Sequence, residues 1–310
     1  MTPIPTVAAP QAARASEFAP VAVPLSSAEA AMAPQGPPAP PAESMPRIVR
    51  FIERFGRAVR VIFEGAGSTT RFLGDTLVSA REVRTWLPRA SEQARRLGVD
   101  SMPIGLFIAV FTGIVLALLA SYSFTGAVPM YFVGTLVGKT ITLELAPVLT
   151  GLALAGRVGA NIAAELGTMR VTEQIDALET LAYDPLAYLV VPRVLAGVVM
   201  FPLVVAAAMI VGVAAGWLAA ALLLDVSSAE FIKGLRLFFR VFDVRYGVVK
   251  AASFGAAVTL IGSMRGLRAR GGAQGVGDAA TSAVVYSAVM ILVLDAFWAV
   301  VWLLGREKSV

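Results

Sequence analysis

Residues 163–181, AAELGTMRVTEQIDALETL, form a charged stretch between two long apolar runs of the sequence. Its charged side chains could not enter the hydrocarbon of a bilayer without a cost of several kcal/mol in total. The apolar runs on both sides would nevertheless hold its ends close to a membrane. We therefore expect this stretch to lie at the membrane surface, in water, where it can face a partner protein. These charged residues are Glu165, Arg170, Glu173, Asp176 and Glu179.

The spacing within the stretch predicts a short amphipathic helix. Val171, Ile175 and Leu178 recur at helical intervals and form one apolar stripe that is available for docking. Thr172 is placed to cap the start of this helix, and Asp184-Pro185 to end it.

The composition identifies an integral membrane protein. Of the 310 residues, 57% are hydrophobic and 15% are charged, and the mean hydropathy is +0.75. A soluble domain of this size could not hide so much apolar surface in one core. The net charge is +5, and the basic residues cluster beside apolar runs. This position favours lipid headgroups over nucleic acid as the anionic partner.

Cysteine and histidine are both absent from the sequence. Disulfides, metal sites built on those ligands and nucleophilic sites that need either residue are therefore excluded. An enzyme is not excluded on this ground, but most of the usual catalytic groups are, and we expect no catalytic residue, no metal and no cofactor.

The chain divides into three predicted regions. Residues 1–45, rich in Pro and Ala, predict a disordered tail, and residues 46–101 a cytoplasmic, interfacial amphipathic region. In the second region eleven Arg and no Lys place the amino-terminal side in the cytoplasm by the positive-inside rule. Within it, residues 47–62 predict an interfacial helix with Arg on one face. Residues 102–310 form the predicted transmembrane domain.

Five apolar runs are long enough to span a bilayer, and the predicted fold is an all-α membrane bundle. The run from Leu186 to Leu224 contains Pro192 and Pro202, so either one long kinked helix or a tight hairpin is possible. The hairpin would give six spans instead of five. The predicted spans are 103–122, 131–157, 197–224, 248–264 and 280–304.

The third loop predicts a second amphipathic helix, at the outer surface, with Phe231, Leu235, Phe238 and Phe242 as its apolar stripe. Two glycine patterns resemble nucleotide-binding loops, at 134–140 and at 275–280, but neither has the required strand before it. The first predicts close helix packing through GxxxG, as do two other pairs. The second predicts a flexible loop after Arg270. The GxxxG pairs are Gly134/Gly138, Gly212/Gly216 and Gly262/Gly266.

Four ionisable residues fall inside the predicted spans, where they should face a partner helix or a wet cavity. Glu144 with Lys250 is the preferred pair, Asp295 is the third buried charge, and Lys139 is expected to reach the outer surface. The Glu144/Lys250 pair fits a polar feature of a substrate pathway, and it fits a structural interhelical ion pair equally well.

The chain resembles the MlaE permease family, the membrane subunits of ABC transporters that move lipids between the two membranes of diderm bacteria. The resemblance rests on Leu143–Ala196, LELAPVLTGLALAGRVGANIAAELGTMRVTEQIDALETLAYDPLAYLVVPRVLA, on GLRARGGAQGVGDAATSAVV from Gly266, and on VLDAFW around Asp295. It implies a homodimer in the bacterial inner membrane that moves phospholipid through a cavity near Glu144 and Lys250.

The same resemblance implies that the chain is a non-catalytic membrane subunit, with ATP hydrolysis in a partner, and it implies several partners. A cytoplasmic ABC ATPase would dock on a coupling helix at about 163–181, an MCE-domain protein would bind lipid on the periplasmic side, and a small cytoplasmic STAS-type subunit is a further candidate. The implied coupling residues are Glu165, Arg170, Glu173, Gln174, Ile175, Asp176 and Leu178.

Two other classes of function stay open on the residues alone. A self-sufficient channel or secondary transporter would use Glu144 and Lys250 for ion or proton coupling. A membrane scaffold would use the surface helix only to recruit proteins.

Overall fold

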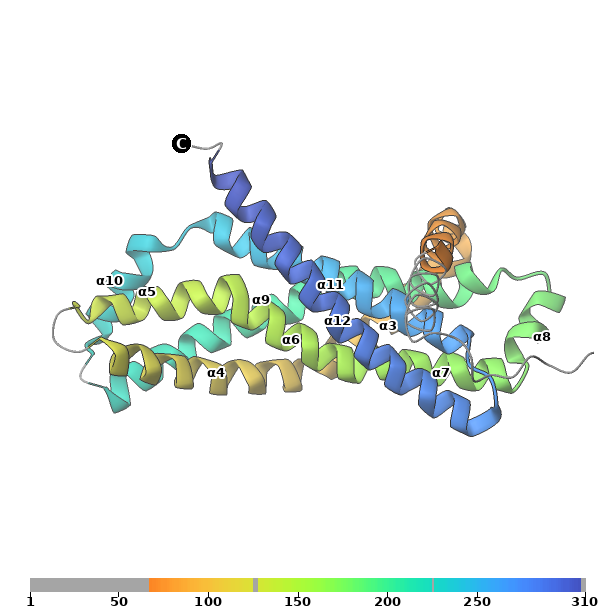
Figure 1. Ribbon diagram of the computed structural model, residues 1–310, viewed down its shortest axis with the longest axis horizontal. Coiled ribbons are helices and arrows are strands. Elements are labelled where there is room, and N and C mark those ends of the chain that lie inside the picture. The colour runs from red at the N-terminus through yellow and green to blue at the C-terminus, as the bar shows by residue number, and fades with distance from the viewer. Residues whose placement is uncertain (1–66, 125–127, 225, 308–310) are drawn as a thin grey trace, which may run out of the picture. The chain divides into compact units, whose positions relative to one another are not determined.

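The computed structural model describes residues 67–124, 128–224 and 226–307, with side chains as far as residue 301. The predicted tail 1–45 and the predicted interfacial helix 47–62 lie outside these residues. Five described helices are long and apolar enough to cross a membrane, as the sequence predicted (Figure 1). They are Val83–Ser123, Tyr131–Val171, Leu186–Leu223, Val241–Leu267 and Gly272–Val301.

The first spanning helix begins well before the predicted apolar run. Its parts are α3 (Val83–Leu97), a 3₁₀ turn η1 (Val99–Ser101) and α4 (Met102–Ser123). Leu97, in α3, is buried in the same apolar cluster as Phe201, so α3 is packed on the bundle rather than being a separate surface segment. Residues 67–79 are also helical.

The second spanning helix is interrupted twice by π-helical turns. It runs through α5 (Tyr131–Thr140), η2 (Ile141–Leu145), α6 (Ala146–Leu154), η3 (Ala155–Gly159) and α7 (Ala160–Val171). Such wide turns inside α-helices occur frequently at functional sites. Glu144 lies in η2 and Arg157 in η3.

The third spanning helix settles the choice between a long helix and a hairpin. A π-helical turn, η4 (Leu186–Val190), leads directly into the 33-residue α9 (Val191–Leu223). Pro192 directly follows the π-helical turn near the start of α9, and Pro202 lies inside the helix without ending it. The described chain therefore has five spans and not six.

The remaining helices are α8 (Gln174–Thr180), α10 (Ser228–Phe238), α11 (Val241–Leu267) and α12 (Gly272–Glu307). Helix α10 confirms the predicted helix in the third loop, but Phe242 belongs to α11. The prediction of a flexible loop after Arg270 is wrong for the residues from Gly272 onward, because α12 begins at Gly272. Gly271 and Gly272 have positive φ angles of 88° and 69°, so the turn before α12 uses the backbone freedom of glycine.

Small residues bring the helices close together, as the GxxxG pattern predicted. A Cβ on Gly212 would lie 3.2 Å from the Ala109 carbonyl oxygen in α4, and one on Gly262 would lie 3.0 Å from the Gly159 carbonyl oxygen. The closest approach joins α5 to α10, where Gly134 and Gly234 each face the other helix's backbone. Thr135 Oγ1 also donates a hydrogen bond to the Gly234 carbonyl oxygen at 2.8 Å.

Candidate functional site

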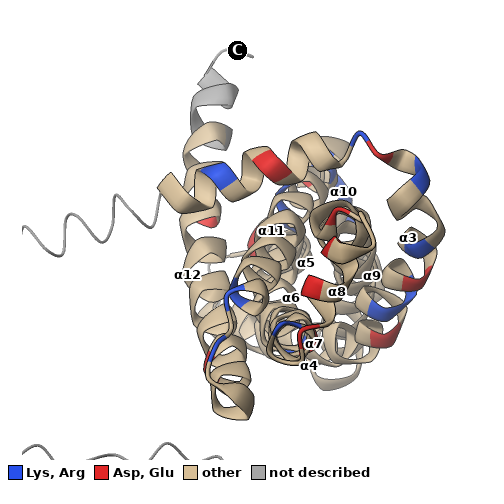
Figure 2. Cartoon of the chain, turned by 90° about the vertical axis from the view of Figure 1, so that its right-hand side faces the viewer, with Lys and Arg blue, Asp and Glu red and all other residues tan. Residues whose placement is uncertain are grey.

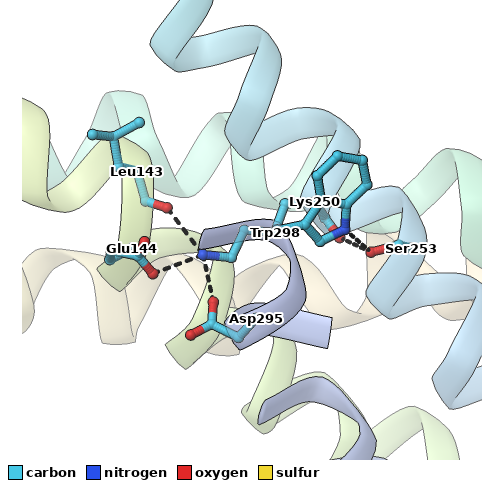
Figure 3. A network of polar contacts seen from close by, with 6 residues as sticks. All are labelled: Leu143, Glu144, Lys250, Ser253, Asp295 and Trp298. Carbon is cyan, nitrogen blue, oxygen red and sulfur yellow. Dashed lines mark hydrogen bonds and ion pairs between the residues drawn. The ribbon is translucent and has the colours of Figure 1, made fainter. Parts of the chain in front are cut away.

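A fully buried lysine connects three spanning helices inside the bundle (Figure 3). Lys250, on α11, has 0% of its side chain exposed. Its Nζ lies 2.7 Å from Glu144 Oε2 on η2 and forms a second ion pair with Asp295 on α12. The structure thus brings Glu144 and Lys250 together as predicted. It adds Asp295, which the sequence marked as a buried charge without giving it a partner.

The π-helical turn supplies a further acceptor to the lysine. Pro147 has no N–H, so it cannot donate the usual i→i−4 hydrogen bond to the Leu143 carbonyl. Lys250 Nζ donates to that carbonyl oxygen at 3.3 Å. The proline and the wide turn therefore present both a backbone oxygen and the Glu144 carboxylate to the same ammonium group.

A second layer of hydrogen bonds holds α11 against α12 beside the lysine (Figure 3). Trp298 Nε1 donates to Ser253 Oγ at 2.9 Å, and Ser253 Oγ donates to the Lys250 carbonyl oxygen at 2.6 Å. These bonds fix the backbone from which the Lys250 side chain extends. Sequence reasoning missed Ser253 and Trp298, because neither is charged and their meeting depends on how two helices pack.

The acidic members of this network reach the surface of the bundle. The side chain of Glu144 is 44% exposed and that of Asp295 is 25% exposed. Carboxylates inside a span are costly in hydrocarbon and should face protein or water. The network of Glu144, Lys250 and Asp295, called the Lys250 network below, therefore requires something other than lipid tails on its open side.

Lys139 also has a partner within the bundle. Its Nζ lies 3.7 Å from Asp243 Oδ2, and the Asp243 side chain is only 2% exposed. Asp243 Oδ2 also accepts a hydrogen bond from the Arg240 backbone N–H at 3.2 Å, at the start of α11. The expectation that Lys139 simply reaches the outer surface is therefore incomplete, since the lysine also joins α5 to α11.

The charged stretch 163–181 is not one helix. Helix α7 continues the second span to Val171, and α8 begins only at Gln174 (Figure 1). Between them Glu173 has a φ of 58°, in the left-handed region. Thr172 does not cap α8, because its hydroxyl donates to the Thr168 carbonyl oxygen at 2.8 Å. Figure 2 views the bundle from this end, where acidic and basic residues are visible around α3, α7 and α8.

The chain continues past α8 through a second sharp turn. Helix α8 ends at Thr180, and Ala182 has a φ of 59°. Asp184 does not end the helix as predicted. Its Oδ1 accepts a hydrogen bond from the Leu186 backbone N–H at 2.9 Å, so Asp184 supports the start of η4 instead.

The apolar side of α8 faces its own chain. Ile175 is 2% exposed and belongs to the apolar cluster that includes Leu166 and Leu189, with Leu178 packed against it. The predicted stripe is therefore not fully available to a partner. The polar face of α8 remains open: Glu173, Gln174 and Asp176 are exposed. Arg170 Nη1 lies 2.6 Å from Asp176 Oδ1, which connects α7 to α8.

A partly buried ion pair joins α7 to α9. Glu165 Oε1 is 2.9 Å from Arg193 Nη2, and the Arg193 side chain is 3% exposed. Arg96, from α3, approaches the same Glu165 oxygen at 3.8 Å. Glu165 is thus bound to residues of its own chain, which the sequence pattern did not indicate.

The family model described as Permease MlaE matches residues 90–301. The chain belongs to the MlaE permease family. Its matched region contains the five-helix bundle from within α3 to the end of the described side chains, including the Lys250 network and α8.

Relatives of this MlaE-family chain carry consistent names. It is 40% identical over 230 residues to a probable ABC transporter permease protein of Rickettsia conorii, covering 74% of this chain and 89% of the relative. It is 40% identical over 206 residues to a probable ABC transporter permease protein of Synechocystis, covering 66% and 78%. It is 32% identical over 249 residues to the intermembrane phospholipid transport system permease protein MlaE of Haemophilus influenzae, covering 80% and 95%.

This MlaE-family bundle also contains an apolar cavity of about 380 Å³ between α9, α10 and the start of α11. Its walls include Met209, Trp217, Phe231, Leu235 and Phe239, and Thr142 is its one hydroxyl-bearing residue. Such walls can accommodate hydrocarbon but offer little to a polar solute.

Proposed function

We propose that this chain is the permease subunit of an ABC transporter that moves phospholipid between the inner and outer membranes of a bacterium. Such transport would maintain the lipid asymmetry of the outer membrane. Family membership and the name of the Haemophilus relative support the class of substrate. The sequence has no complete nucleotide-binding loop, which supports a separate ATPase subunit as the source of energy.

The partly exposed Lys250 network is the observation that carries the proposal. Glu144 lies inside a span with 44% of its side chain exposed, a position that hydrocarbon would penalise. A second copy of the chain facing this side would enclose a cavity with charged groups at one level and apolar walls elsewhere. Those surfaces suit a molecule with a polar head and apolar tails.

The turn and helix at 172–180 provide a place for the ATPase to act. Glu173, Gln174 and Asp176 present a polar surface, while Ile175 anchors α8 in the apolar core. A force applied to the polar face of α8 would therefore pass into α7 and α9 rather than deform a loose loop. Arg170 and Leu178 would support this surface from within the chain, and Glu165 would join it to α9.

The remaining parts of the proposal concern location and partners. Eleven Arg between residues 46 and 101 favour a cytoplasmic position for the amino-terminal side of this multi-pass inner-membrane protein. We place α8 on the same side, facing the ATPase. An MCE-domain protein would receive or deliver lipid on the periplasmic side, and a small STAS-type subunit would bind in the cytoplasm.

A lipid-transfer assay tests this function. The chain, copurified with its partners, is reconstituted in liposomes that contain fluorescent phospholipid, and transfer to acceptor vesicles is followed with and without ATP. We expect transfer that depends on ATP and is lost in the Lys250→Met variant. Ion flux without ATP, with no lipid transfer, would instead establish the channel or secondary transporter.

A further inference from the structure

A polar cavity of about 300 Å³ lies where α3 and η1 meet the second spanning helix. Its volume is at the lower end of the range of about 300–1,000 Å³ that is typical of ligand pockets. It shares no residue with the Lys250 network. Its polar and charged lining includes Gln93, Arg96, Asp100, Ser101, Arg157 and Glu165.

The position of α4 gives the depth of this cavity in the bilayer. Helix α4 has 22 residues, Met102–Ser123, with no charged residue among them, and at 1.5 Å per residue it is about 33 Å long. That length matches a hydrocarbon thickness of about 30 Å. Asp100 and Ser101 directly precede α4, so the cavity lies at the level of the lipid headgroups on the α8 side of the bundle.

One buried polar group in the cavity wall has no protein partner among the described residues. The Ser101 hydroxyl is fully buried and makes no hydrogen bond with any of them. Gln93, which is 8% exposed, lines the same cavity. Because buried polar groups are nearly always hydrogen-bonded, the Ser101 hydroxyl indicates that the cavity holds a polar atom of a ligand or of water.

The charges of the wall favour a ligand that carries both signs. Arg96 is already paired with Glu92 at 2.7 Å and lies near Glu165. Arg157 and Asp100 form no ion pair with any residue that the structure describes. The cavity therefore combines one uncompensated guanidinium with one uncompensated carboxylate.

We propose that this cavity binds the zwitterionic headgroup of a phospholipid of the phosphoethanolamine type, from the leaflet on the α8 side. The phosphate accepts hydrogen bonds from the Arg157 guanidinium, whose planar fork suits phosphate oxygens. Ser101 and Gln93 donate to the remaining phosphate oxygens. The ammonium group pairs with Asp100, which would repel an anionic headgroup. The site stands whether or not the chain transports lipid, because it depends only on the cavity wall.

Native mass spectrometry of the delipidated full-length chain in detergent tests the site. The probes are phosphatidylethanolamine and phosphatidylglycerol with identical acyl chains. We expect at least fivefold tighter binding of phosphatidylethanolamine, and loss of that preference in Arg157→Gln. The matched control is Arg95→Gln, an exposed arginine of α3 outside the cavity, which should keep the preference.

A second variant protects the test against a folding defect. Asp100→Asn changes an exposed residue and should abolish the preference by weakening phosphatidylethanolamine binding, with Asp278→Asn as its exposed control. Equal binding of the two lipids by the unmodified chain, or an unchanged preference in both cavity variants, would overturn the proposal. Displacement of the lipid by soluble phosphoethanolamine at equal concentration would also overturn it, by indicating a site for a free metabolite.

Discussion

The Glu165 carboxylate and the Arg193 guanidinium, 2.9 Å apart, join the middle of α7 to the start of α9. These two helices enter and leave the segment that contains α8. The ion pair therefore closes a loop of chain around α8. Since Arg193 is 3% exposed, it depends on Glu165 for compensation of its charge.

We predict that Glu165→Gln destabilises the protein by about 1–3 kcal/mol, because it leaves a buried guanidinium with weaker compensation. The partial exposure of Glu165 keeps the effect below that of a fully buried pair. Thermal unfolding in detergent measures it. Glu179→Gln changes an exposed acid of α8 and should leave the melting temperature unchanged. Equal melting temperatures for the two variants would contradict a structural role for the pair.

The Lys250 network gives a second prediction, which concerns the stability of variants that remove one or all of its charges. Lys250→Met removes the cation and leaves two carboxylates inside the bundle, which should cost about 3–5 kcal/mol. The triple variant Lys250→Met/Glu144→Gln/Asp295→Asn has no uncompensated charge and should recover most of this stability.

Lipid transfer then separates the two roles of the network. If its charges serve the substrate pathway, the triple variant should fold and still fail to transfer lipid. Transfer at the unmodified rate by the triple variant would show that the charges serve only to hold the helices together.

The burial of Ile175 gives a third prediction, because this residue is covered by its own chain and is not available for docking as its helical spacing predicted. Ile175→Arg would place a charge in the apolar core and should prevent stable folding rather than uncouple a folded protein. Leu181→Arg is the matched control, because Leu181 is 67% exposed just after α8. Size-exclusion profiles in detergent should show aggregation of the first variant and a single symmetric peak for the second.

The close approach of α5 and α10 gives a fourth prediction. A Cβ on Gly234 would overlap the Tyr131 carbonyl oxygen, so Gly234→Ala should lower stability by about 1–3 kcal/mol. In α12 a Cβ on Gly277 would meet no atom within 4 Å. Gly277→Ala should therefore be neutral or stabilising through its better helix propensity. A lower melting temperature for Gly277→Ala than for Gly234→Ala would contradict the packing of α10.

Much of the fold could be predicted because apolar length and hydropathy report directly on membrane spans. The five spans, the α10 helix and the close glycine contacts all follow from one-dimensional patterns. The extents of the first and third spans could not be predicted from such patterns, because α3 is amphipathic and Pro202 lies within a continuous helix. A proline in a sequence permits either a kink or a turn, and only packing decides between them.

The candidate site was predictable in part for a related reason. Charge inside a span is rare enough to single out Glu144, Lys250 and Asp295, but their mutual contacts depend on the rotation of three helices. The break at Glu173 was not predictable, because a glutamate with positive φ has no sequence signature. Helical spacing placed Ile175 in an apolar stripe that was predicted to be available to a partner. In the structure this apolar side of α8 is covered by the chain itself.

The most direct test of the central claim is whether a separate ATPase binds the polar face of α8. The tagged chain is isolated from its host in mild detergent, and the copurifying proteins are identified by mass spectrometry. We predict that an ABC ATPase subunit is recovered with the unmodified chain and with Lys233→Glu, a charge reversal on α10, and that Glu173→Arg loses it. Full recovery of the ATPase with a folded Glu173→Arg variant, or its absence from the unmodified chain, would contradict the account.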